Sequence, residues 1–522
     1  DRRAHIELVD QQDLVIDGQG SELLFHHIRH ALKFIRCRRL LVRNLTIDWD
    51  FPLAAPGVVD ELPDGRVVVR VSEQYPIGDK PLATAVTEYD TANYRWALNP
   101  AEVYYPRDCR LVAPQVIHSP SFAEERRYPH GGRRLLPGMP VCVRHYVYQA
   151  TAIDFSGAGN EDLTFEDVTV HQCPGHAFAG YGCERGFRLS RVKIQRRPGS
   201  NHLTSATADG AHFGNCRGDI LVEDCDFSHQ GDDSINIHAD WFMIRRRVDA
   251  RTVHMTPRLF NPLFRMDVGD ELTFCRGADL DPYAETRLAD WRVDESARVV
   301  VLTVDRDLPE DLAEGDCIAN ETRSSRGFLI RNNYFHDHRA RGILLQAKDG
   351  LVEGNRISRV MGCALQMTSD CNYWKEGYGC RNVVVRGNTF EGCNQATWER
   401  GPAGRHMACV NLLVDTATGL SDKPLHRDIV FEDNVIRDTP GLALLIASAK
   451  NVVVRGNRIV NANTEPFDGA GEGIDAKADG AIMITRASDV DVRDNVITGA
   501  GPAHGLGVYV DGRNTSNVRV KQ

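Results

Sequence analysis

The sequence lacks any long hydrophobic run, and this absence excludes one class of protein. No apolar stretch approaches the ~20 residues that a helix needs to span a membrane. An excess of positive charge is also missing, since the formal net charge is −10. A general nucleic-acid binder is therefore disfavoured. A surface adapted to a strongly anionic polymer is disfavoured too, although the net charge is compatible with a local basic groove.

Paired cysteines are missing as well. The 14 cysteines include no Cys-x-x-Cys pair and show no regular spacing. Several follow apolar, strand-like segments, as Cys37 follows "FIR" and Cys225 follows "LVED". This pattern predicts buried free thiols that behave as small apolar residues, rather than a disulfide framework or a zinc site.

What is present is the composition of a folded protein. Apolar residues make up 42% of the chain, charged residues 26%, and there are 45 glycines. A length of 522 residues suits two or three domains or one long repeat array. The numbering starts at Asp1 without a recognisable leader, so we expect that it begins after processing or trimming. We expect a secreted or periplasmic protein.

A short phrase recurs along most of the chain. It has two or three alternating apolar residues, then a polar pair that often contains Asn, then another alternating pair. Clean neighbours lie 22 residues apart (Asn333 to Asn355), 23 apart (Asn434 to Asn457) and 24 apart (Asp167 to Arg191). Examples are "LLVRNLTI" from Leu40, "LTFEDVTV" from Leu163, "ILVEDCDF" from Ile220, "FLIRNNYF" from Phe328, "VVVRGNTF" from Val383, "IVFEDNVI" from Ile429 and "VVVRGNRI" from Val452.

This spacing predicts a right-handed parallel β-helix. Alternation with a period of two indicates short strands, and strands that recur every 22 to 24 residues indicate a solenoid. The polar pair marks the corner between strands, because Asn tolerates left-handed backbone angles. Leucine-rich repeats have a similar phrase and length. Here the interior positions favour Val, Ile and Phe, and no helical stretch links the repeats.

A second kind of strand follows each corner. If these strands stack in one parallel sheet, about 4.8 Å apart, the residues just before each strand align along one edge. The segments are "GHAFAGY" from Gly175, "GAHFGN" from Gly210, "SINIHA" from Ser234, "GILLQA" from Gly342, "GCALQM" from Gly362, "GLALLIA" from Gly441 and "GAIMIT" from Gly480.

Two stretches interrupt the repeat, and we interpret each as an inserted antiparallel β domain with a barrel-like form. Loops without internal structure rarely exceed ~15 residues, and both stretches contain strand-like segments. The fold class is therefore all-β. The predicted β-helix covers 1–52, 147–240 and 326–522, the first inserted domain 53–146 and the second 241–325.

Three carboxylates fall at the same strand position in consecutive coils. Asp209 precedes "AHF", and Asp232 and Asp233 precede "INIH", so all three converge on one sheet edge. Repulsion between the adjacent pair raises the pKa of one member. This arrangement suits an inverting glycosidase, in which one carboxyl protonates the leaving oxygen and another activates water. Asp-Gly and Gly-Asp are also ordinary turn dipeptides, and Asp-Asp in a corner could bind calcium or face water.

Long motifs also carry a resemblance. They are "LVIDGQGSELLF" from Leu14, "CRRLLVRNLTIDWD" from Cys37, "DGAHFGNCRGDILVEDCDF" from Asp209, "GDDSINIH" from Gly231 and "RGILLQAKDGLVEGN" from Arg341. The chain resembles glycoside hydrolase family 110, the α-1,3-galactosidases, within the polygalacturonase-like β-helices. The resemblance extends from about Leu14 to Asn495 and includes both insertions.

The resemblance implies removal of terminal α-1,3-linked galactose from glycans of blood group B type or related galactans. It implies inversion of configuration and no metal or other cofactor. It also implies Asp232 as the general acid and Asp209 and Asp233 as bases. The chain departs from the polygalacturonase pattern, because it has no RIK triplet and no GHG after the Gly-Asp-Asp coil. Those features serve uronate recognition, so a neutral sugar is favoured.

Further residues near the same edge are candidates for substrate binding. They are His212, Asn236, His238, Arg341, Gln346, Trp374 and Glu376. The histidines could bond sugar hydroxyls, and Trp374 with Glu376 could form an aromatic platform and a polar clamp. Ordinary strand packing, a surface ion pair for Arg341 and loop packing for Trp374 are the alternatives. His176 and Asp50 near the ends of adjacent coils stay unassigned.

Two other functions compete with the glycosidase. A β-helix polysaccharide lyase or epimerase would use a Lys, Arg or His base with calcium, and a chelator would then abolish activity. A non-catalytic glycan-binding β-helix would need no carboxylate trio. The expected partner is a carbohydrate, with no nucleic acid and no membrane. The sequence is also compatible with a homodimer.

Overall fold

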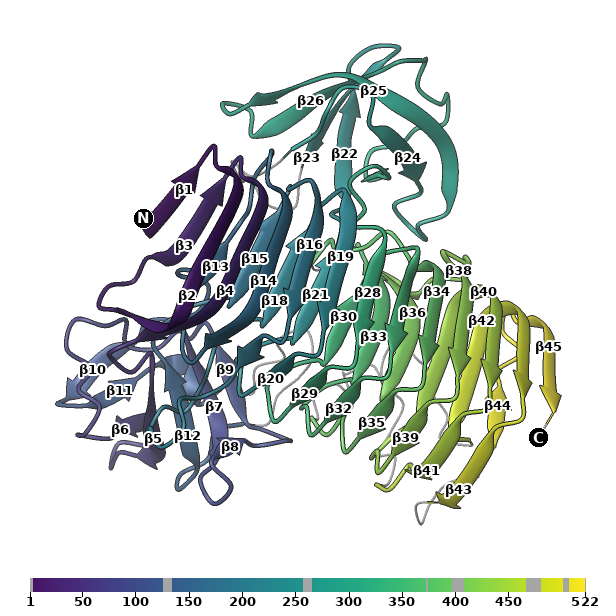
Figure 1. The fold of residues 1–522 in the computed structure, drawn as a ribbon. Helices are drawn as coiled ribbons and strands as arrows, with labels where there is room; N and C mark the ends of the chain where they lie inside the picture. Colours follow the sequence, from purple (N-terminus) through teal and green to yellow (C-terminus); the bar gives the residue numbers. More distant parts are fainter. Residues whose placement is uncertain are drawn as a thin grey trace.

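The computed structural model describes residues 3–124, 134–256, 265–371, 374–396, 408–465, 480–500 and 507–521. A long stack of parallel strands runs from the N-terminus to the C-terminus, and two separate β bodies project from it (Figure 1). Within these ranges there is no α-helix, and only one short 3₁₀ helix, η1 (Pro120–Phe122), occurs. The predicted all-β class and parallel β-helix are confirmed.

The stack contains 31 of the strands in one continuous sheet system, which is parallel apart from one short antiparallel hairpin within 410–420. Its N-terminal part comprises β1 (Ala4–Val9), β2 (Gln12–Phe25), β3 (His30–Ile35), β4 (Arg38–Trp49), β13 (Ile153–Asp154), β14 (Glu161–Val170), β15 (Phe178–Tyr181), β16 (Arg185–Ser190), β17 (Lys193–Ile194), β18 (Ala211–Gly214), β19 (Gly218–Glu223), β20 (Asp226–Ser228) and β21 (Ile235–His238).

The C-terminal part continues the same stack. It comprises β28 (Phe328–Arg331), β29 (Tyr334–His336), β30 (Ile343–Leu345), β31 (Gly350–Glu353), β32 (Arg356–Ser358), β33 (Leu365–Asp370), β34 (Arg381–Arg386), β35 (Thr389–Glu391), β36 (Val410–Thr416), β37 (Gly419–Leu420), β38 (His426–Glu432), β39 (Val435–Arg437), β40 (Leu444–Arg455), β41 (Arg458–Ala462), β42 (Ile482–Arg493), β43 (Val496–Ala500), β44 (Val508–Val510) and β45 (Ser516–Lys521).

Each coil contributes strands to three columns. One column holds the strands β15, β18, β21, β30 and β33. Each strand pairs in parallel with the next, and the pairing has no register shift. The repeated phrase forms the other two columns, because its first half pairs as β19 with β28 and its second half as β20 with β29. Alternation then directs every second side chain inward, and Phe155, Phe165 and Phe187 stack with ring centroids 5.0–5.7 Å apart.

A ladder of buried asparagines closes the corner between two of these columns. Asn388 Nδ2 donates to the carbonyl of Val352 (3.0 Å) and to Oδ1 of Asn434 in the next coil (2.9 Å). Its own Oδ1 accepts from Asn355 Nδ2 at 2.9 Å. The same contact pattern joins Asn333, Asn355, Asn388, Asn434, Asn457 and Asn495.

The ladder corrects one detail of the expected corner. The residue before each ladder asparagine, such as Asn332 (φ 55°) or Asp433 (φ 56°), takes the left-handed conformation, and the asparagine itself points inward. The first residue of each corner therefore makes the turn, and the asparagine after it supplies the buried amide. This amide can satisfy hydrogen-bonding groups of two coils at once.

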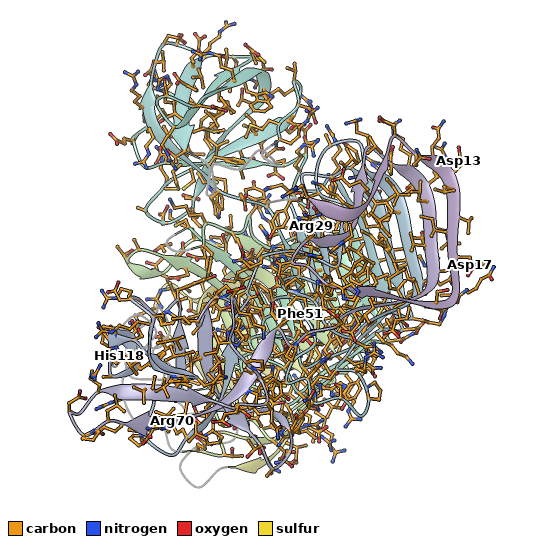
Figure 2. All side chains as sticks on the ribbon, turned by 90° about the vertical axis from the view of Figure 1, so that its left-hand side faces the viewer. Asp13, Asp17, Arg29, Phe51, Arg70 and His118 are labelled. Atoms are coloured by element: carbon orange, nitrogen blue, oxygen red, sulfur yellow. The ribbon has the colours of Figure 1, made fainter. Side chains whose placement is uncertain are left out.

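The first insertion is an antiparallel sheet of eight strands with its own apolar core. Its strands pair in the order β10-β11-β6-β5-β12-β7-β8, and β9 pairs with β7. They are β5 (Ala54–Glu61), β6 (Val67–Val71), β7 (Ala85–Asp90), β8 (Arg95–Trp96), β9 (Glu102–Tyr104), β10 (Arg110–Ala113), β11 (Val116–His118) and β12 (Pro140–Arg144). Figure 2 shows Arg70 and His118 on this sheet, far from Asp13 and Asp17 at the edge of the outermost coil.

The second insertion is a closed antiparallel barrel in the order β22-β23-β26-β25-β24-β27. Its strands are β22 (Phe242–Arg247), β23 (Thr252–Thr256), β24 (Glu271–Cys275), β25 (Pro282–Asp294), β26 (Val299–Val304) and β27 (Cys317–Asn320). The barrel lies on the opposite side of the stack from the first insertion (Figure 1).

Two further expectations concern the absences in the sequence. All 14 cysteines are free and all but Cys109 are buried, so the prediction of buried thiols is confirmed. Across the described ranges, no helix has the length and apolar character that a membrane crossing requires.

We predict that Asn388→Ala strongly destabilises the β-helix. Asn388 is fully buried in the middle of the ladder, and each buried partner left without a hydrogen bond costs about 1–3 kcal/mol. We therefore expect the free energy of unfolding to fall by about 3 kcal/mol, measured as the shift in the denaturant midpoint by circular dichroism.

Asn382→Gly is the control, because Asn382 is exposed in the same coil, donates to Asp349 at 3.1 Å and has a left-handed backbone (φ 54°) that glycine also adopts. Equal shifts for the two variants would contradict a structural role of the ladder.

Candidate active site

Asp209 and Asp233 lie side by side at the edge of the stack. β18 pairs with β21 with Ala211 opposite Ile235, so two residues earlier Asp209 lies opposite Asp233. The amide of Gly210 donates to the carbonyl of Asp233 at 2.8 Å and fixes this register. The coil step therefore stacks Asp209 on Asp233, and Asp232 lies one residue before the stacked pair.

Asp233 is buried and is held from the next coil. Its Oδ1 accepts from the backbone N–H of Arg341 at 2.7 Å and lies 3.4 Å from the Arg341 guanidinium. Arg341 Nε donates in turn to Oε1 of Gln366 at 2.8 Å. Burial raises the pKa of Asp233 well above its usual value and the charges of Asp232 and Asp209 add to this, although Arg341 opposes it.

Asp209 is buried against histidines. Its Oδ2 lies 2.5 Å from Nδ1 of His212 and 3.9 Å from Nε2 of His176. Burial raises the pKa of Asp209 well above its usual value, and the negative charges of Asp232 and Glu376 raise it further. Burial also lowers the pKa of His176 to about 3, so this ring is neutral near pH 7.

Asp232 faces the first inserted domain instead. Its Oδ2 accepts from the hydroxyl of Tyr148, and its Oδ1 lies 3.1 Å from the guanidinium of Arg339. Glu102 on β9 holds the same guanidinium through bonds of 2.7 and 2.9 Å. The adjacent aspartates are thus separated by their partners, since Asp232 contacts Arg339 and Asp233 contacts Arg341.

Two largely buried charged residues of the inserted sheet, Glu102 and Arg144, hold the surroundings of Asp232 in place. Burial alone would raise the pKa of Glu102, but the guanidinium groups of Arg339 and Arg144 outweigh it and hold that pKa below its usual value. Arg144 on β12 is fully buried and donates to the carbonyl of Gly231 at 2.7 Å, directly before Asp232. The insertion therefore anchors both the backbone and the side-chain partner of Asp232.

A second polar group lies along the outer face of β18 and β21. His212 Nε2 is 2.8 Å from His238 Nε2, and His238 Nε2 is 3.9 Å from Oε1 of Glu376. Asn236 Nδ2 donates to Oε2 of Glu376 at 3.4 Å. Together with Arg341, five of the seven predicted substrate-binding residues thus converge near the carboxylates.

Gln346 and Trp374 are the two that are less closely connected. Gln346 is buried and its backbone N–H donates to Ile237, but its Oε1 makes no hydrogen bond within the described residues. Trp374 is 36% exposed, two residues before Glu376, and its backbone N–H donates to Asp370. Asp50 contacts His26 at the first coils and does not join the site.

The two insertions contact the site in different ways. The barrel begins after Asp240, beyond the far end of β21, and His238 at that end is roughly 16 Å along the strand from Asp233. It approaches the site indirectly, because Trp241 N–H donates to the carbonyl of Lys375 beside Glu376. The first insertion acts on Asp232 through Arg339, which Glu102 holds, and through the carbonyl of Gly231, which Arg144 holds.

Sequence reasoning missed several residues of the site. Tyr148, Arg339, Glu102, Arg144 and Gln366 were not singled out, although Arg339 stands two residues before Arg341. Glu102 and Arg144 belong to the first insertion, where no repeat gives a residue its position. A loose signal existed only for Tyr148, which follows the insertion directly at the return to the coils.

Two overlapping groups of side chains have donor atoms close enough to surround a metal ion. They are His176, Asp209 and His212, and His212, His238 and Glu376, with all donor atoms of a group within 4.8 Å. Both ring nitrogens of His212 are engaged, however, by Asp209 at 2.5 Å and by His238 at 2.8 Å. We therefore interpret the cluster as a hydrogen-bonded network of side chains.

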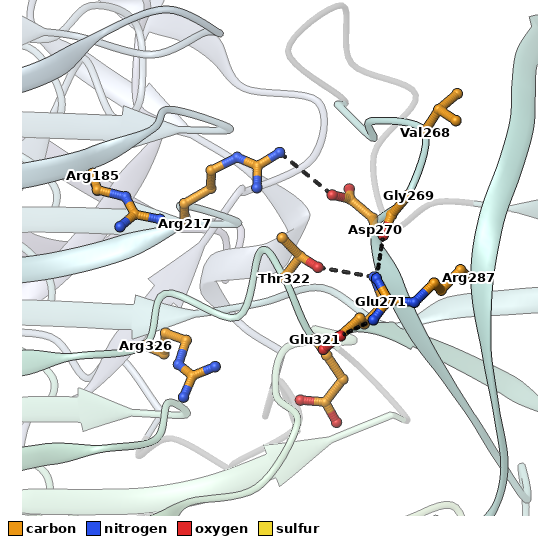
Figure 3. A pocket seen from close by; sticks show the side chains of 10 residues that line it. All are labelled: Arg185, Arg217, Val268, Gly269, Asp270, Glu271, Arg287, Glu321, Thr322 and Arg326. Atoms are coloured by element: carbon orange, nitrogen blue, oxygen red, sulfur yellow. Dashed lines mark hydrogen bonds and ion pairs between the residues drawn. The ribbon is translucent and has the colours of Figure 1, made fainter.

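A hollow of about 400 Å³ lies elsewhere, between the barrel and the coils (Figure 3). Arg217 contacts Asp270 across it at 3.5 Å, and Arg287 contacts Glu271 at 2.6 Å. None of the three site carboxylates lines this hollow. The pair of Arg217 with Asp270 joins a coil to the barrel, so we interpret the hollow as part of the contact between these two bodies.

Comparison with known proteins gives relatives over most of the chain. An α-1,3-galactosidase A of Bacteroides fragilis (strain YCH46) is 26% identical over 476 residues, which is 87% of this chain and 75% of the relative. An α-1,3-galactosidase B of Phocaeicola vulgatus is 26% identical over 512 residues, 89% of this chain and 81% of the relative. The predicted resemblance to the α-1,3-galactosidases is confirmed.

A family model and solved structures also match parts of the chain. The family described as a right-handed β-helix region matches residues 314–404. The catalytic unit of a GH87 α-1,3-glucanase from Streptomyces thermodiastaticus superposes with a TM-score of 0.35 and 13% identity, covering 90% of this chain and 88% of that one. A family 28 exopolygalacturonase of Yersinia enterocolitica gives 0.33 and 11%, covering 97% and 72%.

Proposed function

We propose that this homologue of the α-1,3-galactosidases is an inverting glycoside hydrolase that removes terminal α-1,3-linked galactose from glycans. The observation that carries the proposal is the trio of Asp209, Asp232 and Asp233 at one sheet edge, two of them buried in register. The similarity over 87% of the chain supports the galactoside as the substrate class. Glycans of blood group B type and related galactans are the proposed substrates.

The proposed chemistry needs one proton donor and one proton acceptor. The donor carboxyl gives its proton to the glycosidic oxygen as the bond from that oxygen to C1 breaks. A water molecule attacks C1 from the opposite face and loses a proton to the acceptor carboxylate, so an α-linkage yields β-galactose. This requires the two carboxyl groups to lie about 6.5–9.5 Å apart, which leaves room for the water.

We assign Asp232 as the donor, and Asp209 with Asp233 as the acceptors. The Asp232 side chain is 13% exposed, against 5% for each of the other two, so a leaving oxygen that arrives from solvent reaches it first. Burial raises the pKa of both Asp209 and Asp233, and a carboxylate with a raised pKa is a stronger base once it is ionised.

The proposed function predicts the release of galactose with inversion. We expect an α-1,3-galactoside to be cleaved and the first product seen by NMR to be β-galactose. A panel with α-1,3, α-1,4 and α-1,6 galactosides, with and without a branching fucose, tests the linkage. Early α-galactose would contradict inversion, and the absence of cleavage of every galactoside would contradict the proposed function.

Substitution of the carboxylates separates their roles. We expect Asp209→Asn, Asp232→Asn and Asp233→Asn each to lower kcat by ~10²–10⁴-fold, because each removes a proton-transfer group. Asp232→Asn should recover most of its rate on an aryl galactoside whose leaving group needs no proton, and the other two should not. Asp219→Asn, at an exposed position near the start of β19 in the same coil, is the control. Recovery by Asp233→Asn instead would reverse the assignment.

The raised pKa values also predict the pH dependence. The acceptor carboxylates work only when they are ionised, so kcat/KM falls as the pH drops through their raised pKa. We expect this acid limb well above the ordinary aspartate value of about 4. A limb at or below that value in the wild-type profile would contradict the burial argument.

The first insertion should influence turnover through Arg339. Glu102→Gln removes the charge that holds this guanidinium against Asp232. We expect kcat/KM to fall about 10-fold, or about 1.4 kcal/mol, with the fold preserved. Glu61→Gln at the exposed end of β5 in the same sheet is the matched control. Equal activity of the two variants would contradict this role.

A further inference from the structure

A continuous chain of hydrogen bonds leads from Asp209 away from the other carboxylates. Asp209 Oδ2 lies 2.5 Å from His212 Nδ1, and His212 Nε2 lies 2.8 Å from His238 Nε2. At the far end, His238 Nδ1 is 3.1 Å from the carbonyl of Ala239 and 3.2 Å from Oδ1 of Asp240. Asp209, His212 and His238 are all buried, so this chain is shielded from bulk water.

Hydrogen-bond accounting fixes how many protons this chain contains. Nδ1 of His238 faces two acceptors, so it must carry a hydrogen. One hydrogen must lie between the two Nε2 atoms, and one between His212 and Asp209. The three groups therefore share three hydrogens. The extra one can belong to Asp209, His212 or His238 without the loss of any hydrogen bond.

Charged groups face both ends of the chain. At the histidine end, His238 lies 3.2 Å from Asp240 and 3.9 Å from Glu376, so two carboxylates attract a proton to its ring. At the other end, the negative charges of Asp232 and Glu376 oppose the ionisation of Asp209, whereas the Arg341 guanidinium favours it. Three further neighbours are uncharged near pH 7, namely Tyr181, stacked at 4.8 Å on His212, the ring of His176 at 5.1 Å, and Asn236.

We propose that His212 and His238 act as a proton store for Asp209, keeping one shared proton on an imidazole while the carboxylate accepts a proton from the attacking water. This inference rests on the proposed function. In the step itself, the water O–H bond breaks, its oxygen bonds to C1, and its proton binds Asp209. The hydrogen on His212 Nδ1 stays in place and continues to donate to the carboxyl. After product release Asp209 returns the proton to solvent. The two histidines are positioning residues, because neither contacts the reacting atoms.

His238→Gln tests the store with little change in shape. The glutamine amide can still donate toward His212, but it cannot hold an additional proton. We expect the acid limb of the kcat/KM profile to move up by about one pH unit, so that the rate on its acid side, taken relative to the plateau of the same variant, falls about tenfold. A purely structural role would lower the rate equally at every pH.

His426→Gln is the matched control. His426 is a fully buried histidine on β38 whose ring bonds Cys380 N–H at 2.9 Å and the carbonyl of Leu413 at 2.8 Å. We expect its pH profile to match that of the wild type in shape. A shift of the same size in both variants would overturn the proposal, because it would trace the effect to general loosening of the fold.

A measurement without substrate separates this inference from the proposed function. In ¹⁵N-histidine-labelled protein we expect imidazolium signals that persist above pH 7 in the wild type and disappear in His238→Gln. Neutral signals for both rings at pH 6 would overturn the store. So would activity that a chelator abolishes and a divalent metal restores. If no galactoside is cleaved, the proposed function falls, and the NMR titration alone decides on the store.

Discussion

Parallel hydrogen bonding between successive coils is the constraint on which the rest of the structure depends. Each strand must pair with the equivalent strand one coil away, and this fixes which residues become neighbours. The pairing of β18 with β21 sets Asp209 beside Asp233, and the next pairing sets Arg341 against Asp233. The buried asparagine ladder stabilises the same register at a corner, so the architecture and the geometry of the site have one physical origin.

The insertions supply what a regular coil cannot. A repeat presents the same few positions again and again, whereas an active site needs different partners for neighbouring carboxylates. Glu102 and Arg144 come from the first inserted sheet, and they hold Arg339 and the backbone before Asp232. The barrel holds the segment around Glu376 through Trp241. The electrostatic repulsion between the adjacent Asp232 and Asp233 is offset in this way, because each carboxylate has its own guanidinium partner.

Much of the site was predictable because a repeat of fixed length places equivalent positions of successive coils next to each other. Asp209, Asp233, His212, Asn236, His238 and Arg341 lie at equivalent points of coil strands, so their spacing placed them together. Glu376 was predicted from its loop alone, and it does reach Asn236. Tyr148, Glu102 and Arg144 could not be placed, since no periodic pattern relates an inserted sheet to the coil from which it departs.

The sequence by itself determined the parallel β-helix, the two interruptions and the shared edge of the carboxylates, because local alternation and a fixed period are enough to specify a stacked coil. Only the tertiary structure decided which aspartate stacks on which, and which guanidinium faces each one. It also decided that two histidines connect Asp209 to Asp240 and Glu376. Those contacts join segments up to 237 residues apart, as between Glu102 and Arg339. Side-chain partners over such separations depend on packing between domains, which no local pattern encodes.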